Sequence, residues 1–217
     1  MEYQKFIESD LQFSFNQDWV VKKYDDQNYF KLLAGQGLKG VDFIGIYKEN
    51  FLYLIEVKNY RKRAYSPAAA IWTDLEGALP PLALTFVKKI DDSLKLIRVV
   101  ERAQKRKWWL RLLYYVQDFT GDKRLNKDWK FWRRVYELST QASTVYSVLW
   151  LELDPIFLTQ EDIGETQYLE RLYTLVEGQT DYESDSFSVM SIKTGSTNIE
   201  GVDVAFVQQE MSKRGRE

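Results

Sequence analysis

The sequence predicts an α/β fold in which a central mixed β-sheet is flanked by helices. Segments 41–47 and 51–59 alternate or run apolar on either side of a short polar turn, which predicts a β-hairpin. Further along the chain, segments with helical periodicity alternate with short apolar strands, the order typical of a sheet covered by helices. With 217 residues, of which 45% are hydrophobic, the chain can bury a sizeable core.

The first 40 residues are predicted to contain one helix and one strand. Apolar residues at the start recur at helical spacing: Tyr3, Phe6, Ile7, Leu11 and Phe15. They predict an amphipathic helix over residues 2–15. Segment 18–24 predicts a short strand, and 29–40 becomes a glycine-rich connection to the hairpin.

After the hairpin, two helices and two strands are expected. Segment 82–105 has the periodicity of a long helix, and 126–141 predicts a second one. Segments 108–116 and 144–154 predict strands. Together with the N-terminal elements they form the expected core, residues 1–154.

The C-terminal part, residues 155–217, is expected to elaborate this core. It contains a predicted helix at 165–177, an acidic loop at 178–186, and short strands around Val189 and Val204. The last ten residues are charged, and we expect them to be frayed. We therefore expect the helix and short strands to pack on the core.

The composition excludes several chemistries. The chain has no Cys and no His, which rules out disulfides, Cys/His zinc sites, cysteine nucleophiles and Ser–His–Asp triads. Any metal must therefore be held by oxygen, which favours Mg²⁺, Mn²⁺ or Ca²⁺. No apolar run approaches a membrane span, and the start "MEYQKFIESD" lacks signal-peptide features. These features predict a soluble, cytoplasmic protein with no membrane partner.

Charge is unevenly distributed although the net charge is only −2. Basic residues far outnumber acidic ones between Lys95 and Arg134, whereas acidic residues dominate from Val135 to Asp203. The basic segment in the middle of the chain could bind the phosphates of a nucleic acid. For the tryptophans of the basic segment, buried core positions are favoured over a role as platforms on which nucleic-acid bases stack.

The predicted hairpin carries an unusual set of charged residues. Glu56 and Lys58 are two apart on one strand, so their side chains share a face at a separation of roughly 6.5–7 Å. Asp42 on the neighbouring strand can converge on the same place. Two carboxylates and the backbone carbonyl of Val57 would supply oxygens for a Mg²⁺ ion. Lys58 beside them would orient or help deprotonate a water, or neutralise charge on a phosphate.

These residues resemble the PD-(D/E)xK nuclease superfamily, whose restriction-endonuclease-like core has the order αβββαβ. Asp42 matches the family's aspartate, with Val41 where proline often stands, and Glu56–Val57–Lys58 matches its E-x-K. The resemblance covers residues 1–154 in element order. It implies a hydrolase, an endodeoxyribonuclease that uses Mg²⁺ or Mn²⁺ to cut DNA. It also leaves open a homodimer, since many relatives cut both strands as dimers.

The family resemblance also points to a fourth metal-site residue. Relatives often place a further acid on the first helix, and Glu8 is the candidate here. A solvated helix face is the alternative for Glu8, because helical geometry turns only some of the early acids toward a site.

Several basic residues are candidates for contact with DNA phosphates. Those nearest the hairpin are Lys39, Arg61, Lys62 and Arg63, and those in the basic middle are Arg102, Lys105, Arg106 and Lys107. For each of them an ordinary exposed position is the alternative.

Two other functions stay open. Asp42, Glu56 and Lys58 would form a structural ion-pair cluster in a catalytically inactive nuclease-fold protein that binds nucleic acid or acts as a protein-interaction subunit. The acidic loop at 181–186 would then contact a basic partner, or mimic DNA.

Overall fold

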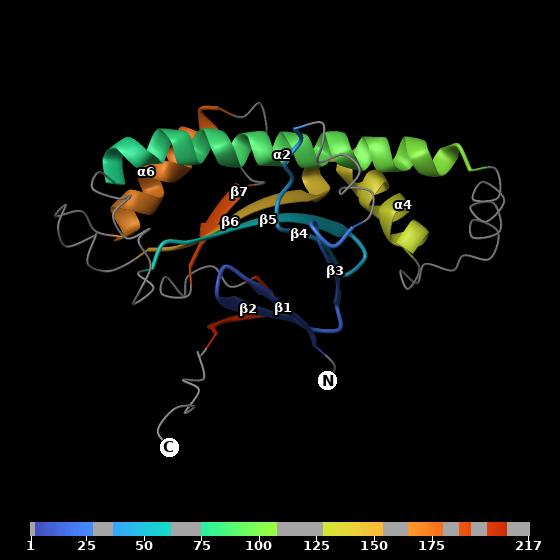
Figure 1. Ribbon diagram of the computed structural model, residues 1–217, viewed down its shortest axis with the longest axis horizontal. Coiled ribbons are helices and arrows are strands. Elements are labelled where there is room, and N and C mark those ends of the chain that lie inside the picture. The colour runs from blue at the N-terminus through green and yellow to red at the C-terminus, as the bar shows by residue number, and fades with distance from the viewer. Residues whose placement is uncertain are drawn as a thin grey trace, which may run out of the picture.

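The computed structural model describes residues 3–27, 37–61, 75–107, 128–153, 165–179, 187–191 and 199–207. These residues form three layers, which are seen edge-on in Figure 1. Helices lie at the top, a five-stranded sheet lies in the middle, and a three-stranded sheet lies below it. The expected α/β class with a mixed central sheet is confirmed.

The five-stranded sheet combines antiparallel and parallel pairs. Its strands are β3 (Trp19–Lys23), β4 (Phe43–Tyr47), β5 (Phe51–Asn59), β6 (Val145–Glu152) and β7 (Phe187–Met190). They lie in that order across the sheet. The first three form an antiparallel meander, and β6 and β7 continue it as parallel strands. A parallel neighbour requires a long crossover, and the chain between β5 and β6 supplies it with helices.

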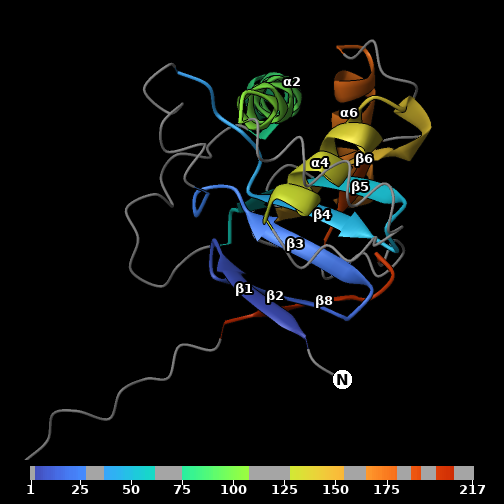
Figure 2. The ribbon, with the colours of Figure 1, turned by 90° about the vertical axis from the view of Figure 1, so that its right-hand side faces the viewer.

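Helices cover one face of this sheet. They are α2 (Leu75–Lys105), α4 (Asp128–Ser139) and α6 (Glu165–Glu177), with a short 3-10 turn, η3 (Ala142–Thr144), before β6. In Figure 2, α2 is seen end-on above the sheet, beside α4 and α6. The apolar stripe of α2 packs with residues of β4, β5 and β6 in one continuous core. The predicted helices at 82–105, 126–141 and 165–177 are confirmed.

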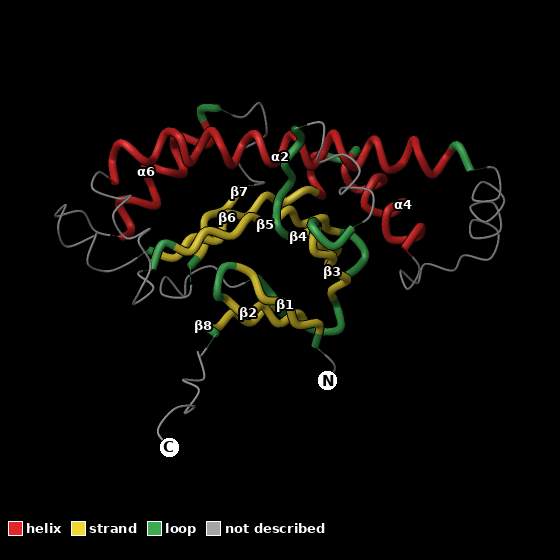
Figure 3. Tube along the Cα trace, viewed as in Figure 1, coloured by secondary structure: helices red, strands yellow, loops and turns green. Residues whose placement is uncertain are grey.

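The three-stranded sheet closes the other face. Its strands are β1 (Gln4–Glu8), β2 (Leu11–Phe15) and β8 (Val202–Phe206), which lie together below the main sheet in Figure 3. β2 pairs with both of the others in antiparallel fashion. Aromatic side chains fill the space between the two sheets. Phe13, for example, lies 5.2 Å from Phe43 and 5.5 Å from Trp150, measured between ring centroids. A second core, separate from that under the helices, therefore joins the three-stranded sheet to the main sheet.

The predicted helix over residues 2–15 is wrong, because these residues form the β1–β2 hairpin. The residues of β2 alternate strictly between buried and half-buried, a period of two rather than 3.6. Ser9 and Asp10 connect the strands with φ angles of 50° and 62°, as in a two-residue type I′ hairpin turn. The expected αβββαβ order therefore begins with a hairpin in place of its first helix.

Six other predicted strands are present in the structure. Strands at 18–24, 41–47, 51–59 and 144–154 are confirmed as β3, β4, β5 and β6, and those near Val189 and Val204 as β7 and β8. The strand predicted at 108–116, the acidic residues 181–186 and the charged tail lie outside the described residues. None of the described helices is both long and apolar enough to span a membrane.

Candidate active site

Asp42 is positioned by the end of the β4–β5 ladder. The last backbone pair of this ladder joins Phe43 to Ile55, so Asp42 lies beside Glu56 and Val57. There the Oδ2 atom of Asp42 accepts the backbone N–H of Val57 at 2.7 Å. The Asp42 side chain thus replaces the backbone hydrogen bond that would come next in the β4–β5 ladder. This contact holds its carboxylate against β5.

Glu56 is a buried carboxylate in the face of β5 that packs under α2. It is only 1% exposed, although its neighbours on this face, Leu52 and Leu54, belong to the apolar core. The Nζ atom of Lys58 lies 2.5 Å from Oε1 of Glu56. The structure therefore brings Asp42, Glu56 and Lys58 together, as the sequence predicted.

The fourth charged group at this place is Lys89 of α2. Its Nζ atom donates to both Glu56 oxygens, at 2.6 and 2.7 Å, and lies 3.8 Å from Oδ1 of Asp42. Sequence analysis missed this residue, since Lys88 and Lys89 resemble two exposed lysines on an amphipathic helix. A usable signal was the helical spacing, because Lys89 falls three residues after Phe86, on the edge of the buried stripe.

The two carboxylates repel each other in a partly dehydrated site. The pKa of Asp42 is raised from 3.8 to about 7, chiefly by burial and then by the charge of the neighbouring Glu56, although Lys89 and the Val57 N–H act in the opposite direction. Tyr60, the next residue on this face after Lys58, has its pKa raised to about 12 by burial and by the charge of Glu56. Ionisation of one carboxylate thus opposes ionisation of the other, and a cation beside both carboxylates offsets this cost.

A network from α2 fixes the segment that leads into Asp42. The buried carboxylate of Asp92 accepts the N–H of Lys39 at 3.2 Å. The hydroxyl of Ser93 accepts the N–H of Val41 at 2.9 Å and donates to the carbonyl of Lys89 at 2.8 Å. One turn of α2 therefore positions both Lys89 and the backbone that carries Asp42.

Gly40 within this segment is required by a close contact. A Cβ atom at this position would lie 2.1 Å from Cε2 of Tyr24, whose ring is buried. The backbone N–H of Tyr24 in turn donates to the carbonyl of Asp42 at 2.9 Å. The packing of Tyr24 on a bare backbone thus contributes to the placement of Asp42.

Glu8, predicted on a helix, lies at the end of β1. Its carboxylate pairs with Lys23 at 2.7 Å, and this hydrogen bond raises the pKa of the lysine. Glu8 also contributes to the raised pKa of Asp42, as the smallest of the causes that act on it. The charge of Glu8, on the three-stranded sheet, therefore acts on Asp42 from a distance, whereas the ion-pair partner of Glu8 is Lys23.

The residues present fit a hard divalent cation in part. Asp42 and Glu56 supply carboxylate oxygens on either side of the Lys89 ammonium, which marks where a positive charge is stabilised. The N–H and C=O of a strand residue point to the same side, so the Val57 carbonyl faces the edge where Asp42 lies. Among the described residues no group of three acids, His or Cys gathers for a metal. Water would complete the shell, as is usual for Mg²⁺.

The basic residues predicted to hold DNA lie in different places. Lys39 is exposed on the segment before Asp42. Arg61 turns toward the three-stranded sheet, with its guanidinium 4.1 Å from the ring centre of Phe206, whereas Glu56 points toward α2. Lys62 and Arg63 lie outside the described residues. The structure thus does not gather Lys39 and Arg61 around Glu56.

The remaining predicted DNA contacts are exposed in the last turn of α2 and in the two residues after it: Arg102, Lys105, Arg106 and Lys107. At a rise of about 1.5 Å per residue, they lie roughly 20–27 Å along the helix from Lys89. They therefore do not line the site.

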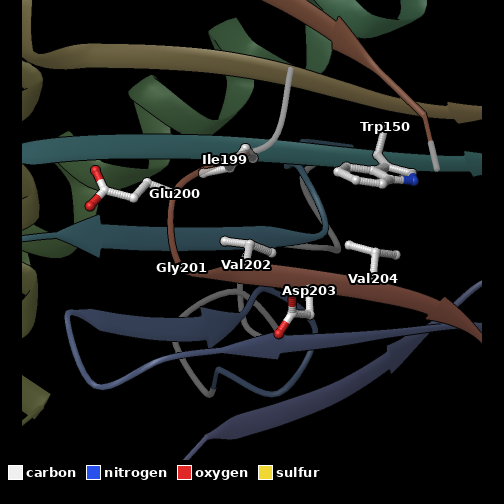
Figure 4. A pocket seen from close by; sticks show the side chains of 7 residues that line it. All are labelled: Trp150, Ile199, Glu200, Gly201, Val202, Asp203 and Val204. Atoms are coloured by element: carbon white, nitrogen blue, oxygen red, sulfur yellow. The ribbon is translucent and has the colours of Figure 1, made fainter. Parts of the chain in front are cut away.

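A pocket of about 360 Å³ lies elsewhere, between β6 and the strand β8 (Figure 4). Trp150 forms one wall, and Ile199, Glu200 and the strand residues 202–204 form the other. The Glu200 carboxylate pairs with Lys48 at 2.9 Å, and its carbonyl accepts the indole N–H of Trp19 at 2.9 Å. Both groups are thus engaged in holding this turn to the main sheet.

Comparisons with known protein families, with curated proteins and with solved structures found no match to this chain.

Proposed function

We propose that this protein is a metal-dependent nuclease that hydrolyses DNA phosphodiester bonds at the site formed by Asp42, Glu56 and Lys58. The observation that carries the proposal is the convergence of two carboxylates and a lysine from adjacent strands, with Asp42 held by the N–H of Val57 at 2.7 Å. A buried acid pair of this kind is costly unless it is compensated by cations. Binding of a divalent ion would offset the cost of burying this acid pair.

The arrangement of strands supports the same family. An antiparallel meander, a helical crossover and a parallel fourth strand are what a restriction-endonuclease-like core would require after its first helix. The acids also lie toward the carboxyl end of β5, and ligands of parallel sheets bind beyond the carboxyl ends of the strands. The β1–β2 hairpin departs from the family order, since the family begins with a helix.

Hydrolysis at this site would exchange one bond to phosphorus for another. A water oxygen bonds to phosphorus, the bond from phosphorus to one sugar oxygen breaks, and the proton from water ends on the leaving sugar oxygen. A bound Mg²⁺ or Mn²⁺ supplies Lewis-acid stabilisation and lowers the pKa of a ligated water. Asp42 and Glu56 would hold it, together with the Val57 carbonyl.

Lys58 and Lys89 suit charge stabilisation better than proton abstraction. Both place their Nζ atoms against Glu56 at ion-pair distance, where each donates a hydrogen bond to the carboxylate. An ammonium group orients water and stabilises the charge that develops on the phosphate oxygens. We assign this role to Lys58, whose side chain is 27% exposed, rather than to the more covered Lys89.

A second candidate function is supported by the same contacts. Two carboxylates and two ammonium groups balance one another without a metal, as in a structural ion network. On that reading the protein is an inactive nuclease-fold subunit that binds nucleic acid or another protein. It predicts that divalent metal neither binds nor changes stability.

The direct test is cleavage of supercoiled plasmid and of single-stranded DNA with Mg²⁺ or Mn²⁺. The wild type is compared with a Glu56→Gln, Lys58→Met variant, in which side-chain size is nearly kept. The matched control carries Lys5→Ala and Glu170→Ala, which removes one base and one acid at exposed positions on β1 and α6.

Metal-dependent nicking by the wild type and the control, but not by the site variant, is the expected result. Equal nicking by all three proteins would assign the activity elsewhere. If none of the proteins nicks DNA with either metal, the second candidate function is favoured.

A further inference from the structure

The outward face of α2 carries a continuous line of basic residues. In Figure 1 this helix lies at the top of the helical layer, on the side of the main sheet opposite the three-stranded sheet. Five basic residues recur on its exposed side at spacings of three, four or seven residues, and a sixth follows directly after the helix, four residues beyond Arg102: Lys88, Lys95, Arg98, Arg102, Lys105 and Arg106. Such spacing places them on one helix face. We call this set the α2 basic stripe.

The α2 basic stripe faces away from the candidate active site. At about 100° per residue, the direction of Arg102 differs from that of Lys89 by roughly 140°, and that of Arg98 by about 180°. Lys89 points under the helix to Glu56, while Arg98 and Arg102 are exposed. The stripe is therefore a surface of its own.

Most of the positive charge on the stripe is not neutralised. Lys95 pairs with Asp92 at 3.5 Å, and Lys105 pairs with Glu101 at 2.8 Å. One acid, the half-buried Asp91, lies within the stripe. Within the described part of the chain the other four basic residues form no ion pair: Lys88, Arg98, Arg102 and Arg106. Their charges are thus open to a partner.

We propose that the α2 basic stripe binds the phosphate backbone of duplex DNA, independently of the candidate active site. From Lys88 to Lys105 the stripe spans about 26 Å along α2, somewhat less than the roughly 34 Å of one turn of B-DNA. Cations at such spacing neutralise phosphates without reading bases. The surface is therefore expected to bind duplex DNA of any sequence.

The composition of the stripe argues against other partners. Interfaces with proteins have an apolar core depleted in charge, and helices that lie on membranes present an apolar face. Here Leu84, 61% exposed, is the only large apolar residue that the described part of α2 exposes. Single-strand binders use aromatic side chains for stacking, and the stripe contains none. Of these partners, duplex DNA matches the charge and composition of the α2 basic stripe best.

The test is binding of a labelled 24-base-pair duplex by fluorescence anisotropy, in EDTA so that no metal-dependent cleavage occurs. The stripe variant carries Arg98→Gln, Arg102→Gln and Arg106→Gln, which preserves helix propensity. The matched control carries Lys5→Gln, Lys48→Gln and Arg171→Gln, so that the same charge is lost at exposed positions elsewhere.

We expect the stripe variant to bind at least tenfold more weakly than the control at low salt. Its slope of log affinity against log salt should be shallower by about 2–3, since each lost phosphate contact removes about 0.9. Because EDTA removes any metal from the candidate active site, a loss of binding by the stripe variant is measured separately from the plasmid nicking that tests the proposed nuclease function.

Three results would overturn the proposal. One is equal weakening in the stripe variant and the control. Another is binding of single-stranded DNA or of polyglutamate as tight as that of the duplex. The third is no duplex binding by the wild type even at about 50 mM salt, where phosphate contacts are strong.

Discussion

The ammonium of Lys89 lies between two carboxylates: 2.6 and 2.7 Å from the oxygens of Glu56, and 3.8 Å from Asp42. Because Lys89 comes from α2 and Glu56 from β5, this contact ties the helical layer to the sheet. It also places a positive charge where a divalent cation would bind. An ammonium and a metal ion would therefore compete for the same oxygens.

We expect Lys89→Met to destabilise the protein and to make it respond more strongly to Mg²⁺. Removing one partner of a buried ion pair costs about 3–5 kcal/mol, and here it leaves Glu56 with Lys58 alone. Mg²⁺ binding to the folded state would then restore stability by mass action. The measurement is denaturant unfolding with and without Mg²⁺.

Lys88→Met is the control for this experiment, because Lys88 is the exposed neighbour on the same helix. It should change the free energy of unfolding by no more than about 0.5 kcal/mol. Equal stabilisation of the wild type and Lys89→Met by Mg²⁺ would show that Lys89 does not occupy the cation position.

Asp42 should make stability depend on pH. Its folded-state pKa of about 7 lies above the ordinary 3.8, so the folded protein retains a proton there that the unfolded chain loses. The stabilising contribution is thus fully present below pH 3.8 and is lost as pH rises through 7. The largest slope is about 1.4 kcal/mol per pH unit.

The check is chemical denaturation across this pH range in EDTA, for the wild type and Asp42→Asn. Asparagine can still accept the N–H of Val57 but cannot titrate. We expect the variant to gain stability over the wild type as pH rises. A difference that stays constant with pH would show that Asp42 is not perturbed.

Ser93→Ala should loosen the segment before Asp42. The substitution removes the acceptor for the N–H of the buried Val41, at a cost of about 1–3 kcal/mol. If the proposed function holds, nicking should fall as well, because Asp42 is next in the chain. Unfolding and plasmid nicking are the two measurements.

Ser139→Ala in α4 is the comparison for Ser93→Ala, since that partly exposed hydroxyl donates only to the Tyr136 carbonyl at 2.8 Å. It should cost less than about 1 kcal/mol. Similar losses for both serines would argue against a special role for the Val41 contact.

Gly40→Ala should destabilise the protein by overpacking. The new Cβ would meet the Tyr24 ring at 2.1 Å, and inserting atoms into a packed core costs about 1–3 kcal/mol. A Tyr24→Leu substitution should relieve part of this loss, so the double variant should lose less than the sum of the single ones. Additive losses, measured by denaturant unfolding, would contradict the steric explanation.

The strands and helices of the main sheet layer were predictable because their patterns are local. The alternation and the apolar run on either side of residues 48–50 predicted β4 and β5, and helical spacing predicted α6 with the bounds 165–177 that the structure has. The convergence of Asp42 with Glu56 followed as well, since a short hairpin fixes its own register.

The N-terminal hairpin was not predictable in the same way. Tyr3, Phe6, Ile7 and Leu11 match a helix at spacings of three and four, whereas the strand pairing and the burial of alternate residues in β2 show that the period is two. The choice between helix and strand depends on the pairing partner, because β2 pairs with β8, about 190 residues further along the chain. A local pattern cannot contain that contact.

The sequence by itself determined the α/β class, the hairpin and the acids and lysine placed on it, because backbone periodicity and short turns act over a few residues. The tertiary structure decided which lysine of the Lys88–Lys89 pair reaches Glu56, and that Arg102 faces away from it. Those outcomes depend on how α2 is rotated on the sheet. That rotation is set by packing between residues that are distant in the chain.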